Sequence, residues 1–161
     1  MLEREVDLNR SVQLISHFNS DENINIMIME VFKTHKNSRK LVDYLLFLLN
    51  LQNEDKETIF NLCKLISDLL DLTKTSLFYK NDLDSFISIC IKTLESTYTN
   101  ELRFHFLNIL NKIFNYKDYF ESKYKLDILV EILENYVYNG HVDETNQNLS
   151  REILEKIESN S

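Results

Sequence analysis

The sequence predicts an all-α protein, and three observations support this fold class. The chain has one glycine and no proline in 161 residues, whereas tight β-turns and phosphate-binding loops need residues that turn sharply or adopt positive φ. Apolar residues recur at the helical period of 3.6 along the chain. The polar corners between these segments are short. We therefore predict an armadillo- or HEAT-like α-solenoid of seven or eight helices, with an irregular helical bundle as the alternative.

Three predicted helices lie before residue 50. The first covers residues 6–18, with Val6, Val12, Ile15 and Phe18 on one face, and ends at the polar residues 19–21. The second covers residues 22–34. The third covers residues 41–49 and is apolar on nearly all sides, so we expect it to lie in the centre of the stack.

Three more helices follow in the middle of the chain. The fourth covers residues 55–73 with Asp55 as its N-cap, and the fifth covers residues 83–94. Asn81 and Asp82 precede the fifth apolar stripe, and we interpret both as capping residues, because their side-chain oxygens accept bonds from free backbone N–H groups. The sixth covers residues 100–114, with Thr99 or Asn100 as its cap.

The last two predicted helices cover residues 121–138 and residues 149–157. Gly140 lies where a left-handed C′ residue would end the seventh helix. Helix pairs then recur at roughly 40 residues, close to the armadillo and HEAT interval. The length suits a single helical domain spanning residues 1–161.

Composition and motifs argue against several classes of function. The net charge of −8 disfavours nucleic acid as the main partner. No apolar segment approaches the roughly 20 residues that span a bilayer, and the charged start MLEREVDLNR lacks the apolar core of a secretory signal. Cys63 and Cys90 lie on apolar stripes, as free thiols of a reducing compartment do. We expect a cytoplasmic monomer.

No catalytic, metal or cofactor site is predicted. A chain with one glycine cannot form the common nucleotide-binding loops, and its four histidines have no metal-ligand spacing. The run from Asn81 to Asp84 resembles the start of a calcium loop, but Phe86 stands where that loop requires glycine. Without proline the chain has no PxxP ligand for an SH3 domain. We expect that it is not an enzyme and acts by binding a protein.

Three short motifs occur in a fixed order: Leu77-Phe78-Tyr79-Lys80-Asn81-Asp82-Leu83, Leu102-Arg103-Phe104-His105-Phe106-Leu107 and Tyr124-Lys125-Leu126-Asp127. Together they resemble the leucine-rich, armadillo-like domain of the WISH/DIP family over residues 55–135. Animal members of this family bind SH3 adapters, and yeast members act at endocytic actin patches.

The resemblance implies a non-catalytic protein that binds the actin-related protein 2/3 complex and activates it to nucleate linear actin filaments, in the cytoplasm at cortical actin patches. A helical scaffold, an adaptor or a subunit of a larger assembly with an unrelated partner is the alternative. Arg103 and Lys125 are the charged members of two motifs, and Phe104 and His105 lie off the apolar stripe. These four are the predicted partner-binding residues. Alternatively, Arg103 pairs with Glu101 or Asp127 to hold helices together.

Overall fold

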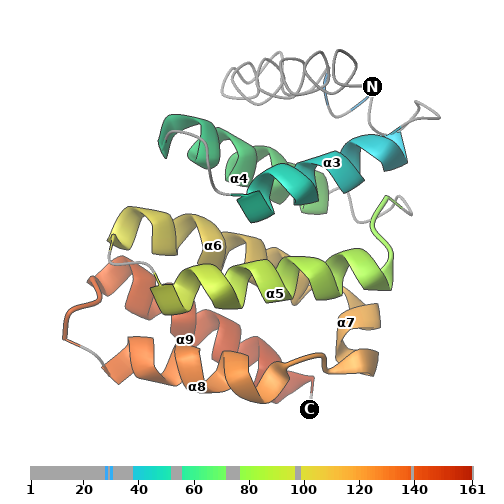
Figure 1. Ribbon diagram of the computed structural model, residues 1–161. Coiled ribbons are helices and arrows are strands. Elements are labelled where there is room, and N and C mark those ends of the chain that lie inside the picture. The colour runs from blue at the N-terminus through green and yellow to red at the C-terminus, as the bar shows by residue number, and fades with distance from the viewer. Residues whose placement is uncertain are drawn as a thin grey trace. The chain divides into compact units, whose positions relative to one another are not determined.

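The structure is a computed structural model that describes residues 38–51, 56–71, 77–96, 99–138 and 140–160, together with Ile28 and Glu30. These residues form seven helices and no strand, so the all-α prediction is confirmed for them (Figure 1). The first predicted helix and the predicted cap Asp55 lie outside the described residues, and so does the second predicted helix apart from Ile28 and Glu30. The helices are α3 (Ser38–Leu51), α4 (Lys56–Asp71), α5 (Lys80–Ser96), α6 (Asn100–Ile113), α7 (Lys117–Ser122), α8 (Leu126–Tyr138) and α9 (Glu144–Ser159).

The chain divides into two compact units, Met1–Phe78 and Tyr79–Ser161. In the first unit, α3 packs against α4. Helix α3 buries one face, made of Val42, Leu45, Leu48 and Leu49. The sequence predicts a position in the centre of the stack for this helix, whereas Phe47 is 53% exposed and Leu51 is 44% exposed.

Helix α4 follows the predicted stripe closely. Leu62, Ile66 and Leu69 are fully buried, and Lys64 pairs with Asp68 one turn later on the exposed side, at 2.9 Å. Cys63 is a buried free thiol, and burial raises its pKa far above the ordinary value. Cys90 in α5 is also free and buried. Both cysteines therefore act as small apolar core residues, as predicted.

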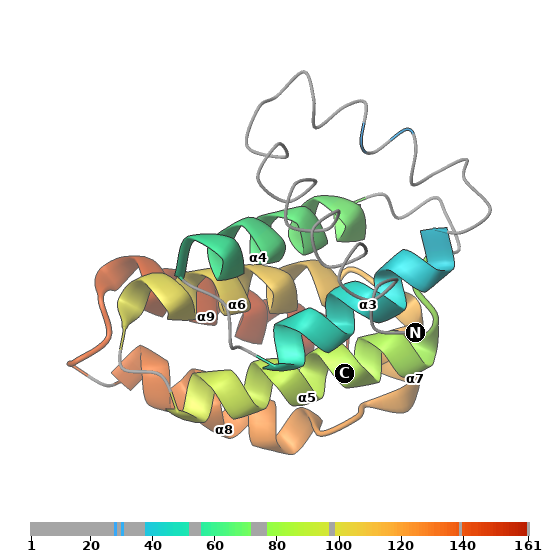
Figure 2. The ribbon, with the colours of Figure 1, turned by 45° about the horizontal axis from the view of Figure 1, so that its top comes forward.

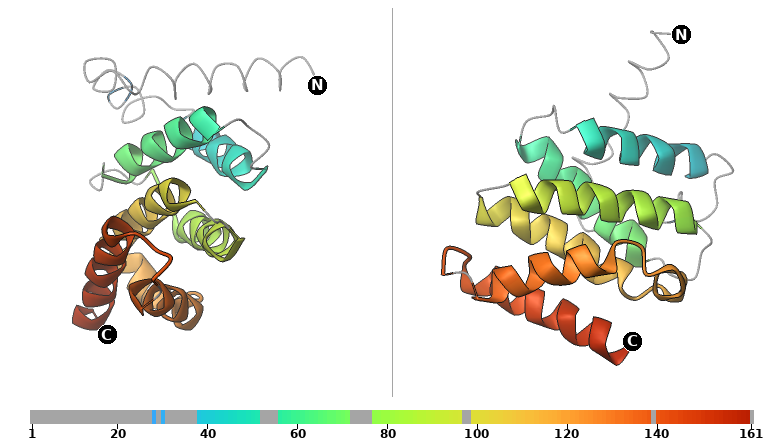
Figure 3. Two further views of the ribbon diagram at one scale, coloured as in Figure 1. Left: turned by 90° about the vertical axis from the view of Figure 1, so that its left-hand side faces the viewer. Right: turned by 60° about the horizontal axis from the view of Figure 1, so that its bottom comes forward.

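The second unit consists of two antiparallel helix pairs, and the short helix α7 lies between the two pairs in the order of the chain. Helix α5 pairs with α6, and α8 pairs with α9. The two pairs form successive layers, which the end-on view in the left panel of Figure 3 shows. Within this unit α5 lies along α8, and α6 lies along α9 (Figures 1 and 2). Each helix of one pair therefore covers the corresponding helix of the other.

Polar contacts connect the two layers along α6 and α9. The side-chain amide of Asn146 donates to the carbonyl oxygen of Asn100 at 2.8 Å. Further along both helices, the side-chain amide of Asn111 donates to Glu152 at 3.0 Å, and Lys156 donates to the side chain of Asn111. Contacts that advance along both helices in the same order indicate that α6 and α9 run in the same direction.

The predicted seventh helix is two helices in the structure. Lys123 ends α7 with φ of 48°, and Lys125 has φ of 53°, so the prediction of one continuous helix over residues 121–138 was wrong. The physical cause is Tyr119 of α7, which is fully buried with its ring 4.9 Å from that of Phe114. Its hydroxyl donates to the carbonyl oxygen of Tyr124 at 3.2 Å, which stabilises the turn between the helices.

The predictions for the connection to the last helix were also partly wrong. Gly140 does not have a positive φ, so it is not a left-handed C′ residue. Helix α9 begins five residues before the predicted start, because Asp143 is its N-cap and accepts a bond from the Asn146 N–H at 2.8 Å. The first turn of α9 lacks apolar residues, and the apolar period alone could not locate this start.

Candidate partner-binding residues

Arg103 is half-buried near the start of α6 and contacts Tyr136 of α8, which in turn contacts α5. Its Nη1 donates to the side-chain oxygen of Asn100 at 2.7 Å, and its guanidinium lies over the ring of Tyr136 in α8, 5.4 Å from the centroid. The Tyr136 hydroxyl donates in turn to the carbonyl oxygen of Leu94 in α5 at 2.6 Å. Arg103 therefore holds neighbouring helices together, and this packing restrains its side chain.

The side chain of Tyr136 is buried, with only 6% of its surface exposed. Burial raises the pKa of its phenol above the ordinary value, and the nearby Arg103 guanidinium opposes that shift. The phenol therefore stays protonated at neutral pH and serves as a hydrogen-bond donor to Leu94.

Phe104 and His105 lie next to Arg103 but on a more exposed side of α6. Phe104 is 37% exposed, and its ring meets the His105 ring edge to face, with 5.7 Å between the centroids. Burial lowers the pKa of His105, while Glu101 one turn earlier acts in the opposite direction. The imidazole is therefore mostly neutral at neutral pH, and the pair presents an aromatic surface.

Lys125 belongs to a separate polar group beside the middle of α5. Its Nζ donates to Ser88 Oγ at 3.2 Å and lies 5.2 Å from the centroid of the Tyr124 ring. The Tyr124 hydroxyl also hydrogen-bonds Ser88, at 3.1 Å. That hydrogen bond is the main reason why the pKa of Tyr124 is lowered, and Lys125 adds to the effect. Lys125 itself is exposed.

The structure does not bring all four predicted binding residues together. Lys125 lies directly before α8, whereas Tyr136, the partner of Arg103, lies in its last turn. These positions are separated by most of the helix, or roughly 16 Å at about 1.5 Å per residue. Arg103, Phe104 and His105 form one group, and Lys125 belongs to another.

The two predicted capping residues occupy different positions in the first turn of α5. The carboxylate of Asp82 accepts a bond from the Tyr79 N–H at 2.7 Å, the contact made by an acidic third residue of a capping box. Asp82 is only 4% exposed. Asn81 is exposed, and its carbonyl oxygen accepts a bond from the Ser85 hydroxyl at 2.8 Å. At α6, Thr99 is the N-cap residue, but its side chain makes no capping bond.

A scan against family models gives a match to the SPIN90/Ldb17 leucine-rich domain over residues 6–129. The match covers about three quarters of the chain. The chain belongs to this family. This is the domain of the WISH/DIP family, so the resemblance predicted from the three motifs is confirmed. The match begins well before residue 55, where the predicted resemblance starts. Comparisons with curated proteins and with solved structures gave no match.

All three motifs lie within the SPIN90/Ldb17 match. Some of the residues that pack against the helix of the second motif, α6, lie outside it. Tyr136 and Asn146 follow residue 129. The two polar contacts of Tyr136, with Arg103 and with Leu94, were not predicted. A periodic pattern identifies buried positions, but it does not identify which buried hydroxyl meets which carbonyl in another helix.

The described residues contain neither a metal-ligand cluster nor a helix suited to span a membrane. Among them no three histidine, cysteine or acidic side chains gather as metal ligands would. Of the four histidines in the sequence, His17 and His35 lie outside the described residues, and His141 is exposed. None of the described helices has both the length and the apolar character needed to cross a bilayer.

Proposed function

We propose that this chain is a non-catalytic binding protein that engages the actin-related protein 2/3 complex and activates it to nucleate linear actin filaments. The observation that carries the proposal is membership of the SPIN90/Ldb17 leucine-rich domain family, because the resemblance of its motifs to the WISH/DIP domain implies this activity. The proposal places the protein in the cytoplasm, as a monomer, at cortical sites where actin assembly accompanies endocytosis.

The proposal includes an armadillo- or HEAT-like solenoid arrangement. The layered pairs α5–α6 and α8–α9 support it, because corresponding helices lie side by side. From Lys80 to Leu126, the first residues of α5 and α8, the chain advances by an interval within the range of about 40–47 residues that is typical of these repeats. Such a stack presents an extended surface without needing a catalytic group.

Activation would follow from selective binding. A protein that binds the active arrangement of a complex more tightly than the inactive one shifts the population toward the active arrangement. Phe104 is the exposed aromatic of the α6 motif and Lys125 is the exposed cation of the following motif. Because the two lie near opposite ends of α8, a partner that contacts both must cover a broad surface.

Actin assembly with purified components tests this function. The chain would be added to actin and the actin-related protein 2/3 complex without preformed filaments. We expect filament growth to begin sooner, with microscopy showing linear filaments rather than branches. If the folded protein neither binds the complex nor shortens the lag, the proposal fails. In that case a helical scaffold or adaptor with another protein partner is the better interpretation.

A further inference from the structure

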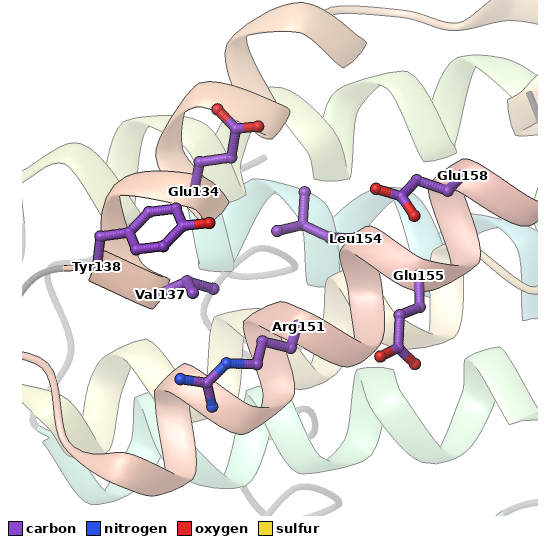
Figure 4. Close-up of a pocket in the computed structure, with 7 residues that line it drawn as sticks. All are labelled: Glu134, Val137, Tyr138, Arg151, Leu154, Glu155 and Glu158. Atoms are coloured by element: carbon purple, nitrogen blue, oxygen red, sulfur yellow. The ribbon is translucent and has the colours of Figure 1, made fainter.

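Helices α8 and α9 leave an open groove of about 400 Å³ between their outer faces (Figure 4). The residues from α9 are spaced three and four apart and form one stripe on that helix. The groove is lined by Glu134, Val137 and Tyr138 of α8 and by Arg151, Leu154, Glu155 and Glu158 of α9.

The apolar part of the groove has a prominent aromatic neighbour. Val137 and Leu154 are half-buried on facing helices, and Tyr138 is 86% exposed beside them. Tyrosine is enriched among the residues that contribute most to protein interfaces, because it offers a large rigid surface and a polar end. An apolar side chain of a partner could occupy the space over Leu154 and lose contact with water.

The charges around the groove are unequal. Glu134, Glu155 and Glu158 are exposed, and within the described residues none of them is paired with a lysine or arginine. Arg151 lies near Val137, away from Glu158 (Figure 4), and donates to Asn148 at 2.6 Å. The groove therefore has a net negative charge that a cationic partner would complement.

The groove lies outside the region that the family match describes. The match ends at residue 129, and every residue that lines the groove follows it. Membership of the family therefore assigns no role to this surface. The inference does not rest on the proposed function.

We propose that the α8–α9 groove binds a basic amphipathic segment of a partner protein. Apolar side chains of the segment pack on Val137 and Leu154, and lysine or arginine side chains approach the three glutamates. A cationic head over the Tyr138 ring adds a cation–π contact. A second copy of the chain is a poorer occupant, because a symmetric contact would bring the same glutamates together.

Binding of a defined probe to the full chain tests this proposal. The probe is a fluorescein-labelled amphipathic peptide of leucine and lysine, and its counterpart carries glutamate in place of lysine. Fluorescence anisotropy would compare the native protein with the double variant Glu155→Lys, Glu158→Lys and with Tyr138→Ser. The matched control is Glu95→Lys with Glu121→Lys, which changes the net charge equally at exposed positions outside the groove.

We expect the lysine peptide to bind the native protein and the control, and to bind the groove double variant about tenfold or more weakly. Tyr138→Ser should also weaken binding, and the glutamate peptide should not bind. Circular dichroism would verify that each variant is folded. Equal loss of binding in the control would show attraction to net charge alone and overturn the proposal. Self-association that disappears in the groove variant would also overturn it, in favour of a second copy.

Discussion

The guanidinium of Arg103 lies over the ring of Tyr136, and the hydroxyl of the same tyrosine donates to Leu94. One aromatic side chain thus connects α5, α6 and α8. We predict that Arg103→Gln lowers the free energy of unfolding by about 1–2 kcal/mol, because both the cation–π contact and the bond to Asn100 are lost. Urea denaturation would measure the change. Arg151→Gln, at an exposed arginine, is the control and should change stability by no more than about 0.5 kcal/mol.

The exposed aromatic of the α6 motif should affect partner binding without affecting the fold. Phe104→Ser should weaken binding to the purified actin-related protein 2/3 complex by about tenfold, as loss of a central aromatic contact does, while the melting temperature changes little. Tyr79→Ser replaces another exposed aromatic and serves as the control. A folded Phe104→Ser protein that binds as well as the native protein would exclude Phe104 from the interface.

Lys125 can be tested independently of Arg103 because the two lie near opposite ends of α8. We predict that Lys125→Glu weakens binding to the same complex, since it reverses an exposed charge of the third motif. A double reversal of Arg103 and Lys125 would be harder to interpret, because Arg103 also holds helices together. Lys117→Glu, at an exposed lysine of α7, is the matched control. Equal effects of the two reversals would indicate a general charge effect.

Alanine substitutions at Asn81 and Asp82, in the first turn of α5, should have different effects on stability. Asp82→Ala should lower the free energy of unfolding by about 1–2 kcal/mol, because the buried carboxylate accepts the Tyr79 N–H and such capping bonds contribute about this much. Asn81→Ala should change it by less than about 0.5 kcal/mol, because the side chain is exposed. Both effects can be read from denaturation midpoints. Equal losses would show that Asn81 also caps the helix.

His105 should make stability depend on pH. Because burial lowers its pKa in the folded state, the unfolded chain binds the proton more readily, and stability decreases as the pH falls below about 6.5, the ordinary value. We predict that His105→Gln reduces this loss between pH 7 and about pH 5. The difference between native and variant melting temperatures isolates His105 from the other titrating groups. Parallel pH curves for the two proteins would contradict the prediction.

The helical period predicted α4, α5 and α6 well, because each has one continuous stripe of apolar residues buried against neighbours. It failed at residues 123–125 for a physical reason. Two lysines adopt positive φ there, although glycine or asparagine usually marks such a position. The buried ring of Tyr119 determines that turn, and its contact with Phe114 could not be read from local sequence.

The candidate site was predictable only in part. The motifs located Arg103, Phe104, His105 and Lys125, but their spacing could not reveal that Arg103 is held by Tyr136 while Lys125 lies beside Ser88. The groove between α8 and α9 was not predicted either. Its lining residues come from two helices, and each set alone has the composition of an ordinary solvated face.

The family match ends inside α8, but the packing of the second unit continues through α9. Leu133, Tyr136, Ile153 and Ile157 are all buried beyond residue 129. A chain shortened at the last matched residue would leave apolar faces of α5 and α6 open to water, and exposed faces of this kind promote aggregation. The residues of the second unit should therefore open and close together in amide hydrogen exchange. We expect this cooperative segment to continue beyond residue 129, where the family match ends.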